Sequence, residues 1–253
     1  MTSALSTAPS AFGPKEPSAA VTVDYATRRA PLAGVEMLSK SMGPHLAMNM
    51  PDFFDDVPKV RMYDPLADFL GAAEGGIIEY SYHDAVKLAG HSCPTVAAAF
   101  WLTRQALVAL YGDALPERGA IRVEFAAGIS MGVTGVTANV ASMLTGAAGD
   151  SGFKGLAGRF ARKDLLAFNS AIPLAVRFTR QDNLAYVDAV ADLAQVPTPP
   201  ELGLLMSRCL SGDSSLEDSR RFKMLWQDRV RRILLDHADN TNVFILSKCE
   251  RIG

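Results

Sequence analysis

The chain has 253 residues, of which 49% are apolar, and it carries a formal net charge of −2 with a pI near 6.1. This length supports one large domain, which we place at residues 31–253, after a flexible N-terminal tail or arm over residues 1–30. The near-neutral charge argues against nucleic acid as a partner, because nucleic-acid-binding surfaces normally show a basic excess.

Cysteine usage and the lack of long apolar runs define the expected compartment. Cys93, Cys209 and Cys249 are too few and too far apart for a disulfide framework, so we expect free thiols. The start of the chain lacks the pattern of a secretory signal, and no run reaches the roughly 18 apolar residues of a membrane span. The sequence therefore predicts a cytoplasmic protein without membrane contact.

The N-terminal region is rich in Ala, Ser, Thr and Pro and shows little periodicity, as in a tail or in an arm laid on a partner subunit. The segment 38–54 that follows contains one histidine among three methionines: His45, Met42, Met48 and Met50. Methionine fills irregular gaps in cores and subunit contacts more often than it binds metal. We therefore expect this segment to form part of an interface between two copies of the chain.

The strongest secondary-structure signal covers residues 94–111. Pro94 suits the first turn of a helix, an apolar face follows, and Gly112 is a typical stop. Before it, residues 65–71 predict a short helix, and residues 76–84 predict a strand that leads into another helix. We place Cys93 at the N-cap of the long helix.

The rest of the chain mixes strands and helices without regular alternation. Strands are expected at 120–125, 173–178 and 242–249, and helices at 133–144, 183–193, 200–210 and 216–236. The last of these helices has an apolar stripe that includes Trp226 and a face that mixes basic with acidic residues, typical of a solvated or subunit-contact helix. This order favours an α+β fold with a mixed sheet packed by several helices.

The entrance of the long helix gathers residue types suited to a metal. An N-cap favours negative charge, which stabilises a thiolate on Cys93, and His91 lies two residues earlier. Imidazole and thiolate are standard zinc ligands, and His83 is the nearest candidate for a third. Weaker candidates are Cys209, Cys249, His45 and His237. A buried thiol beside a turn-capping histidine explains the pair equally well.

The residues from "GHSCP" through the following helix, strand and "LTGAAGDSGFKGL" resemble the FmdE-like family, which is named for a component of formylmethanofuran dehydrogenase. The resemblance covers roughly residues 76–168 and implies an α+β domain, often dimeric, with a metal, commonly zinc. It assigns ligand positions to His91 and Cys93. Two departures stand out: Ala89 replaces a second histidine of the family, and Ala147 replaces a second cysteine.

The glycine-rich stretch 146–155 and the basic residues after it raise a second possibility. Lys154 and Arg159 suit a small acidic metabolite, and the glycines suit an anion-binding loop. No Walker pattern is present, and a flexible connection with a solvated turn accounts for the same residues.

Three interpretations of the function follow. In the first, three protein ligands hold zinc and leave a fourth position for water or substrate, as in hydrolytic or lyase-type enzymes. In the second, the same residues carry haem iron or another transition metal without catalysis. In the third, the chain is a structural protein with an inert thiol. We also expect a homodimer in which His45 reaches Cys93 of the other copy.

Overall fold

The computed structural model describes residues 49–249, and residues from Met50 onward belong to one compact unit. The expected N-terminal tail, His45, Met42 and Met48 lie outside the described residues. The described end of the expected interface segment packs inward, because Phe54 is buried and Phe53 contacts the same core.

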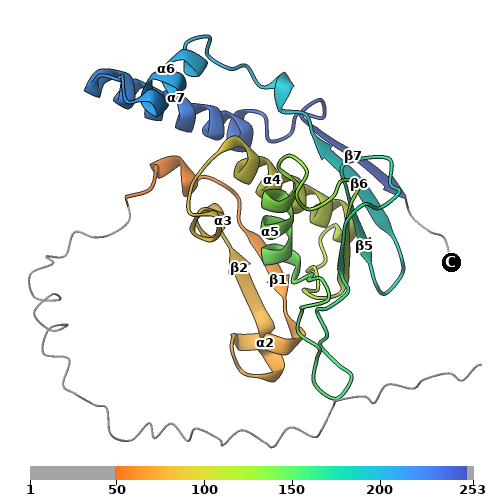
Figure 1. The fold of residues 1–253 in the computed structure, drawn as a ribbon. Coiled ribbons are helices and arrows are strands. Elements are labelled where there is room, and N and C mark those ends of the chain that lie inside the picture. Colours follow the sequence, from red (N-terminus) through yellow and green to blue (C-terminus); the bar gives the residue numbers. More distant parts are fainter. Residues whose placement is uncertain (1–48, 250–253) are drawn as a thin grey trace, which may run out of the picture. The chain divides into compact units, whose positions relative to one another are not determined.

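The described residues build two sheets and a set of helices (Figure 1). The helices are α2 (Pro65–Phe69), α3 (Tyr82–Ala89), α4 (Pro94–Tyr111), α5 (Thr134–Thr145), α6 (Leu202–Ser211) and α7 (Leu216–Arg231). The strands are β1 (Val60–Tyr63), β2 (Ile77–Tyr80), β3 (Ile121–Phe125), β4 (Leu166–Ala167), β5 (Val176–Arg180), β6 (Tyr186–Ala191) and β7 (Phe244–Cys249). Short 3-10 turns at Asp52–Phe54, Glu74–Gly76 and Leu193–Gln195, and a π-helical turn at Arg232–Asp236, complete the elements.

The larger sheet has the strand order β4-β3-β5-β6-β7. Its pairs are antiparallel except for β3 with β4, which is parallel. Strands β1 and β2 form a separate antiparallel hairpin. Helices α4 and α5 lie against one face of the larger sheet (Figure 1), so the expected α+β fold is confirmed.

Helix α4 forms the centre of the core. Side chains from Val96 to Leu110 on several of its faces are buried, because the sheet, α3, α5 and the π-helical turn all contact it. The outer face of the sheet is polar instead: Arg177 donates through Nε and Nη2 to the carboxylate of Asp188 at 2.7 and 2.8 Å. This division into an apolar and a polar face is typical of an antiparallel sheet that has helices on one side and solvent on the other.

One element differs in kind from its prediction. Residues 183–193 were expected to form a helix, but strand β6 occupies Tyr186–Ala191 between β5 and β7. Val187 and Ala189 are fully buried two positions apart, which is the period of a strand. The expected strand at 173–178 also begins later, at Val176.

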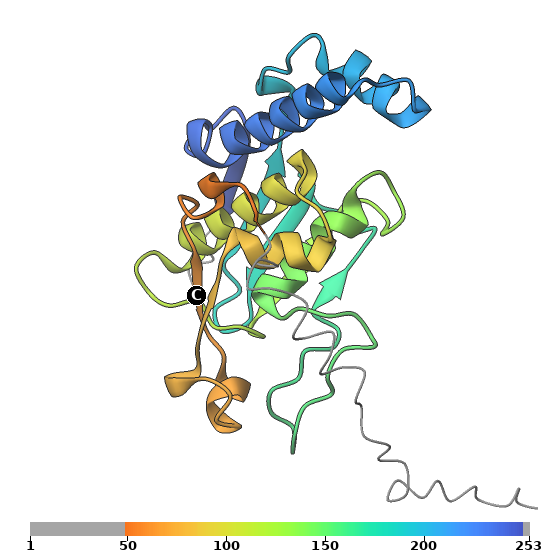
Figure 2. The same ribbon diagram turned by 90° about the vertical axis from the view of Figure 1, so that its left-hand side faces the viewer.

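Helices α6 and α7 form a hairpin beside the core (Figure 2). They share a small apolar cluster of Leu202, Leu205 and Leu225, with Phe222 and Trp226 packed against it. The far end of α7 reaches the main core through Val230. On the expected basic face of this helix, Arg221 pairs with Glu201 at 2.6 Å, and Arg231 and Arg232 pair with Asp228.

Candidate functional site

The first turn of α4 has the geometry that the sequence predicts. Pro94 occupies the first helical position, and Cys93 is the N-cap with extended backbone angles. The backbone N–H of Val96 donates to Cys93 Sγ at 3.5 Å. The sulfur therefore lies at the positive end of an 18-residue helix, where negative charge is favoured. Cys93 is half-buried, so its sulfur is not sealed inside the core.

His91 is exposed, and its ring is oriented by the main chain. Its Nδ1 lies 2.9 Å from the carbonyl oxygen of Ala89. A carbonyl only accepts hydrogen bonds, so Nδ1 must carry the proton and the neutral ring keeps the lone pair on Nε2. A backbone carbonyl behind the ring is a common arrangement for a metal-binding histidine.

Ser92, between the two candidate ligands, is fixed from three sides. Its hydroxyl donates to Gln227 Oε1 at 3.0 Å and lies 3.0 Å from the hydroxyl of Tyr82. Its carbonyl accepts from Trp226 Nε1 at 3.0 Å and from Gln227 Nε2 at 3.4 Å. Burial raises the pKa of Tyr82 well above its usual value, which keeps its hydroxyl protonated. Helices α3 and α7 thus hold the His-Ser-Cys turn in place.

The substitution Trp226→Phe tests how much the hydrogen bond from Trp226 to the Ser92 carbonyl contributes to stability. Phenylalanine keeps an aromatic ring but removes the N–H that donates to Ser92, so we expect the free energy of unfolding to fall by about 1 kcal/mol. Urea denaturation measures the change. Met224 is exposed on the same helix, and Met224→Leu provides the control. Equal stability of wild type and Trp226→Phe would show that the bond to Ser92 contributes nothing.

His83, the expected third ligand, lies apart from the pair. It occupies the first turn of α3, where its Nε2 is 3.7 Å from Asp55 Oδ1 and its ring contacts Phe54. His91 follows the other end of this 8-residue helix, and such a helix is about 12 Å long. In residues 49–249, no three His, Cys, Asp or Glu side chains are grouped so as to hold a metal ion.

The weaker candidates also lie elsewhere or outside the described part. Cys209 Sγ is 3.9 Å from the hydroxyl of Ser219, and His237 Nδ1 is 3.2 Å from Asn240 Nδ2. His45 and the side chain of Cys249 are not described. The described structure thus supplies two donors, His91 and Cys93, which fit a metal by chemistry but do not complete its coordination.

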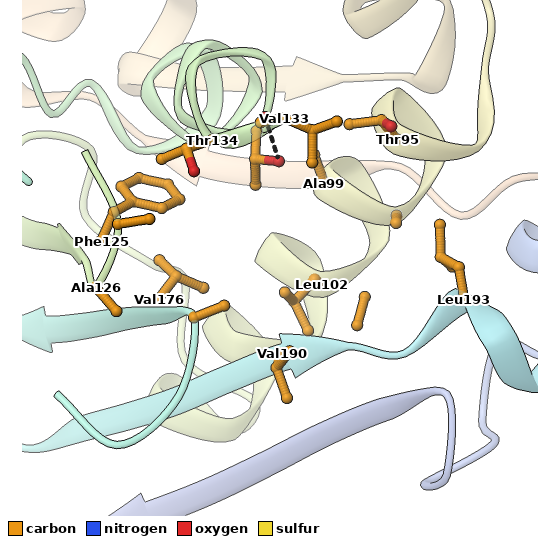
Figure 3. Close-up of a pocket in the computed structure, with 15 residues that line it drawn as sticks. Thr95, Ala99, Leu102, Phe125, Ala126, Val133, Thr134, Val176, Val190 and Leu193 are labelled. Carbon is orange, nitrogen blue, oxygen red and sulfur yellow. Dashed lines mark hydrogen bonds between the residues drawn. The ribbon is translucent and has the colours of Figure 1, made fainter. Parts of the chain in front are cut away.

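An apolar cavity of about 210 Å³ runs along the flank of α4 (Figure 3). It starts at Thr95, two residues after Cys93, and lies between α4, the first turn of α5 and the sheet. The side chains in Figure 3 are apolar except for three threonines, Thr95, Thr134 and Thr137. The sequence analysis did not predict this cavity. Two pairs of small residues that line it, Ala98 with Ala99 and Ala126 with Ala127, could have indicated the space between α4 and the sheet.

The two residues expected to bind an acidic ligand separate in the structure. Arg159 lines a different cavity, together with Arg118 and Arg162. Lys154 is exposed on the same loop and lines neither that cavity nor the apolar cavity along α4. Sequence reasoning did not find Arg118, because it belongs to the approach to β3, remote in the chain from the basic loop.

Comparison with known proteins adds no relative. No protein-family model matches the sequence, and no curated protein is similar enough to count as a match. The resemblance to the FmdE-like family therefore stays a prediction. Within residues 49–249, no helix has both the length and the apolar character needed to cross a membrane.

Proposed function

We propose that the protein binds a divalent transition metal, zinc before others, through His91 and Cys93. The observation that carries this proposal is the orientation of His91: the Ala89 carbonyl holds Nδ1–H, which leaves Nε2 as a donor two residues before an N-cap sulfur. Nitrogen and sulfur donors of this kind match zinc. A bound zinc ion would act as a Lewis acid toward a water or a substrate oxygen.

Metal content tests this proposal directly. We expect protein purified without added metal to hold zinc, and Cys93→Ser to lower zinc affinity by at least about 100-fold, since even groups behind the ligands change affinity by roughly 10–100-fold. Competition against a chromophoric chelator measures the affinity. Cys209→Ser is the matched control, because Cys209 is also half-buried but lies on α6, where its sulfur contacts Ser219 of α7. Absence of zinc from the wild type, or equal affinity in both serine variants, would refute the proposal.

Two donors require more ligands, and we propose that His45 of a second copy supplies one within a homodimer. Large apolar side chains stay exposed on the described surface, including Leu210 at 81% and Leu216 at 69%, which is consistent with association. Closed dimers are the commonest soluble assemblies. The dimer itself is tested by light scattering, where a monomer mass at micromolar concentration would contradict it.

Mixing two variants separates a shared site from a local one. Cys93→Ser and His45→Ala should each lose zinc when studied alone. If His45 acts on the other copy, subunit exchange between these variants restores one complete site in each mixed dimer, and zinc binding returns. If His45 binds within its own chain, the mixture stays empty. Unchanged zinc affinity in His45→Ala alone would remove His45 from the site.

A further inference from the structure

A buried charged cluster lies at the end of α5 remote from the apolar cavity. Asp64, the N-cap of α2, accepts from Arg118 Nη1 at 2.9 Å and from Arg162 Nη2 at 2.6 Å. The side chains of Asp64 and Arg162 are 5% and 7% exposed. Gly146, which caps the C-terminus of α5, lies directly against both arginines. One carboxylate thus faces two guanidinium groups.

The protonation states make this cluster positive. Burial pushes the pKa of Asp64 upward, but hydrogen bonds from Arg118 and the Ala67 amide and the two arginine charges outweigh burial and hold the pKa below its usual value. Burial lowers the pKa of Arg162, which Asp64 opposes, and an arginine stays charged at neutral pH. The cluster therefore carries a net charge of +1.

One donor group of the cluster lacks a hydrogen-bond acceptor among the described residues. Arg162 Nη1 is fully buried and finds no hydrogen-bond partner among the described residues. It packs against Gly119, where an added Cβ would lie 1.5 Å from it. A nearby anion would stabilise a desolvated guanidinium that lacks a full set of acceptors, because opposite charges attract each other more strongly in a medium of low polarity than in water.

A cavity of about 310 Å³ opens over the cluster. Arg159 also lines this cavity, with the guanidinium carbon 4.7 Å from the centre of the Phe160 ring. In the described part of the chain, Arg159 forms no ion pair with a carboxylate. Besides Arg159, the residues that line the cavity and enter the argument are Glu117, Arg118, Gly119, Phe160 and Arg162.

Charge counting favours an anion in this cavity. Three arginines contribute +3, Glu117 on the wall and Asp64 beneath contribute −2, and the sum is +1. Guanidinium groups match carboxylate and phosphate oxygens through paired hydrogen bonds. The volume also leaves room for the body of a metabolite behind its anionic group.

We propose that this cavity binds a small metabolite through a carboxylate or phosphate group, held by the three arginines that line it, Arg118, Arg159 and Arg162. The sequence predicts an acidic ligand held by Lys154 and Arg159. In the proposed site, Arg159 keeps this role, and Arg118 and Arg162 take the place of Lys154. It does not depend on a metal at Cys93, because no residue near the His-Ser-Cys turn lines the cavity.

Calorimetric titration with inorganic phosphate, and separately with citrate, tests the proposal at an ionic strength held constant with sodium chloride. We expect the wild-type protein to bind at least one probe with millimolar or tighter affinity. Arg159→Gln should weaken that binding about tenfold, the loss of one charge-assisted contact. Lys154→Gln removes a positive charge from the same loop outside the cavity and should leave binding unchanged.

Each outcome has one meaning. Phosphate alone identifies a phosphorylated ligand, citrate alone a carboxylate ligand, and both a general oxyanion site. No binding of either probe, equal losses in Arg159→Gln and Lys154→Gln, or wild-type affinity in Arg159→Gln would each overturn the proposal. Arg159 is exposed, so the unliganded variant should keep the wild-type melting temperature, and a loss of binding then reports on the cavity and not on the fold.

Discussion

Replacing Asp64 with asparagine is expected to lower the free energy of unfolding by about 3–5 kcal/mol, the cost of removing one partner from a buried charge cluster. Asp64 is the carboxylate that both Arg118 and Arg162 contact, and it also accepts from the Leu66 and Ala67 amides at 2.9 and 3.1 Å. Asparagine keeps the shape and one acceptor oxygen but removes the carboxylate charge that both guanidinium groups contact. Urea denaturation at pH 7 measures the loss.

A surface pair provides the control. Asp182 is 58% exposed and pairs with Arg180, so Asp182→Asn should cost less than about 1 kcal/mol. Similar losses in the two variants would mean that burial of the Asp64 cluster adds nothing to its stability.

The dependence on pH gives a second check on Asp64. Its pKa in the folded protein lies below the ordinary value of about 4. A depressed carboxyl pKa contributes stability that is fully present above the ordinary value and is lost as the pH falls through the folded-state pKa. The stability difference between wild type and Asp64→Asn should therefore be constant near neutrality and shrink below about pH 4. A difference that persists in acid would show that the negative charge is not its source.

Gly119→Ala is expected to cost about 3–4 kcal/mol, from backbone strain and displacement of a buried charge together. Gly119 has a φ of +89°, and a Cβ there would lie 1.5 Å from Arg162 Nη1 and 2.3 Å from its Cζ. Arg162 is buried and bound to Asp64, so it cannot move aside without breaking that contact.

Gly149→Ala is the matched control for this substitution. Gly149 lies in the loop that follows α5, and an added Cβ there meets no atom within 4 Å. Its stability should change by less than about 0.5 kcal/mol. We also expect Gly119→Ala to weaken the binding of phosphate or citrate, whereas Gly149→Ala should not. Equal stabilities of the two alanine variants would contradict the close packing of Arg162 on Gly119.

Local signals explain what the sequence predicts well. The bounds of α4 follow from Pro94 and Gly112, and the N-cap position of Cys93 follows from Pro94 alone, because start and stop residues act within one turn. Strand β3 is equally local, since buried and half-buried residues alternate along it. These signals suffice to place His91 and Cys93 at a helix entrance.

Contacts between residues far apart in the chain explain the features that the sequence does not predict. Strand β6 is a strand because β5 and β7 flank it, and β7 lies more than fifty residues further on. Gln227, which holds Ser92, is 135 residues from it, and Arg162 is 98 residues from Asp64. No local pattern links such residues. His83 illustrates the converse, because closeness in sequence predicted a shared site while helix α3 separates the two histidines.

X-ray absorption at the zinc edge tests the central claim, that Cys93 and His91 bind a metal, most directly. For zinc-loaded wild-type protein we predict a shell with one sulfur at about 2.3 Å and nitrogen or oxygen donors at about 2.0–2.1 Å. The sulfur should disappear in Cys93→Ser and remain in Cys209→Ser. A wild-type shell without sulfur, or a sulfur that survives in Cys93→Ser, would contradict the proposed site.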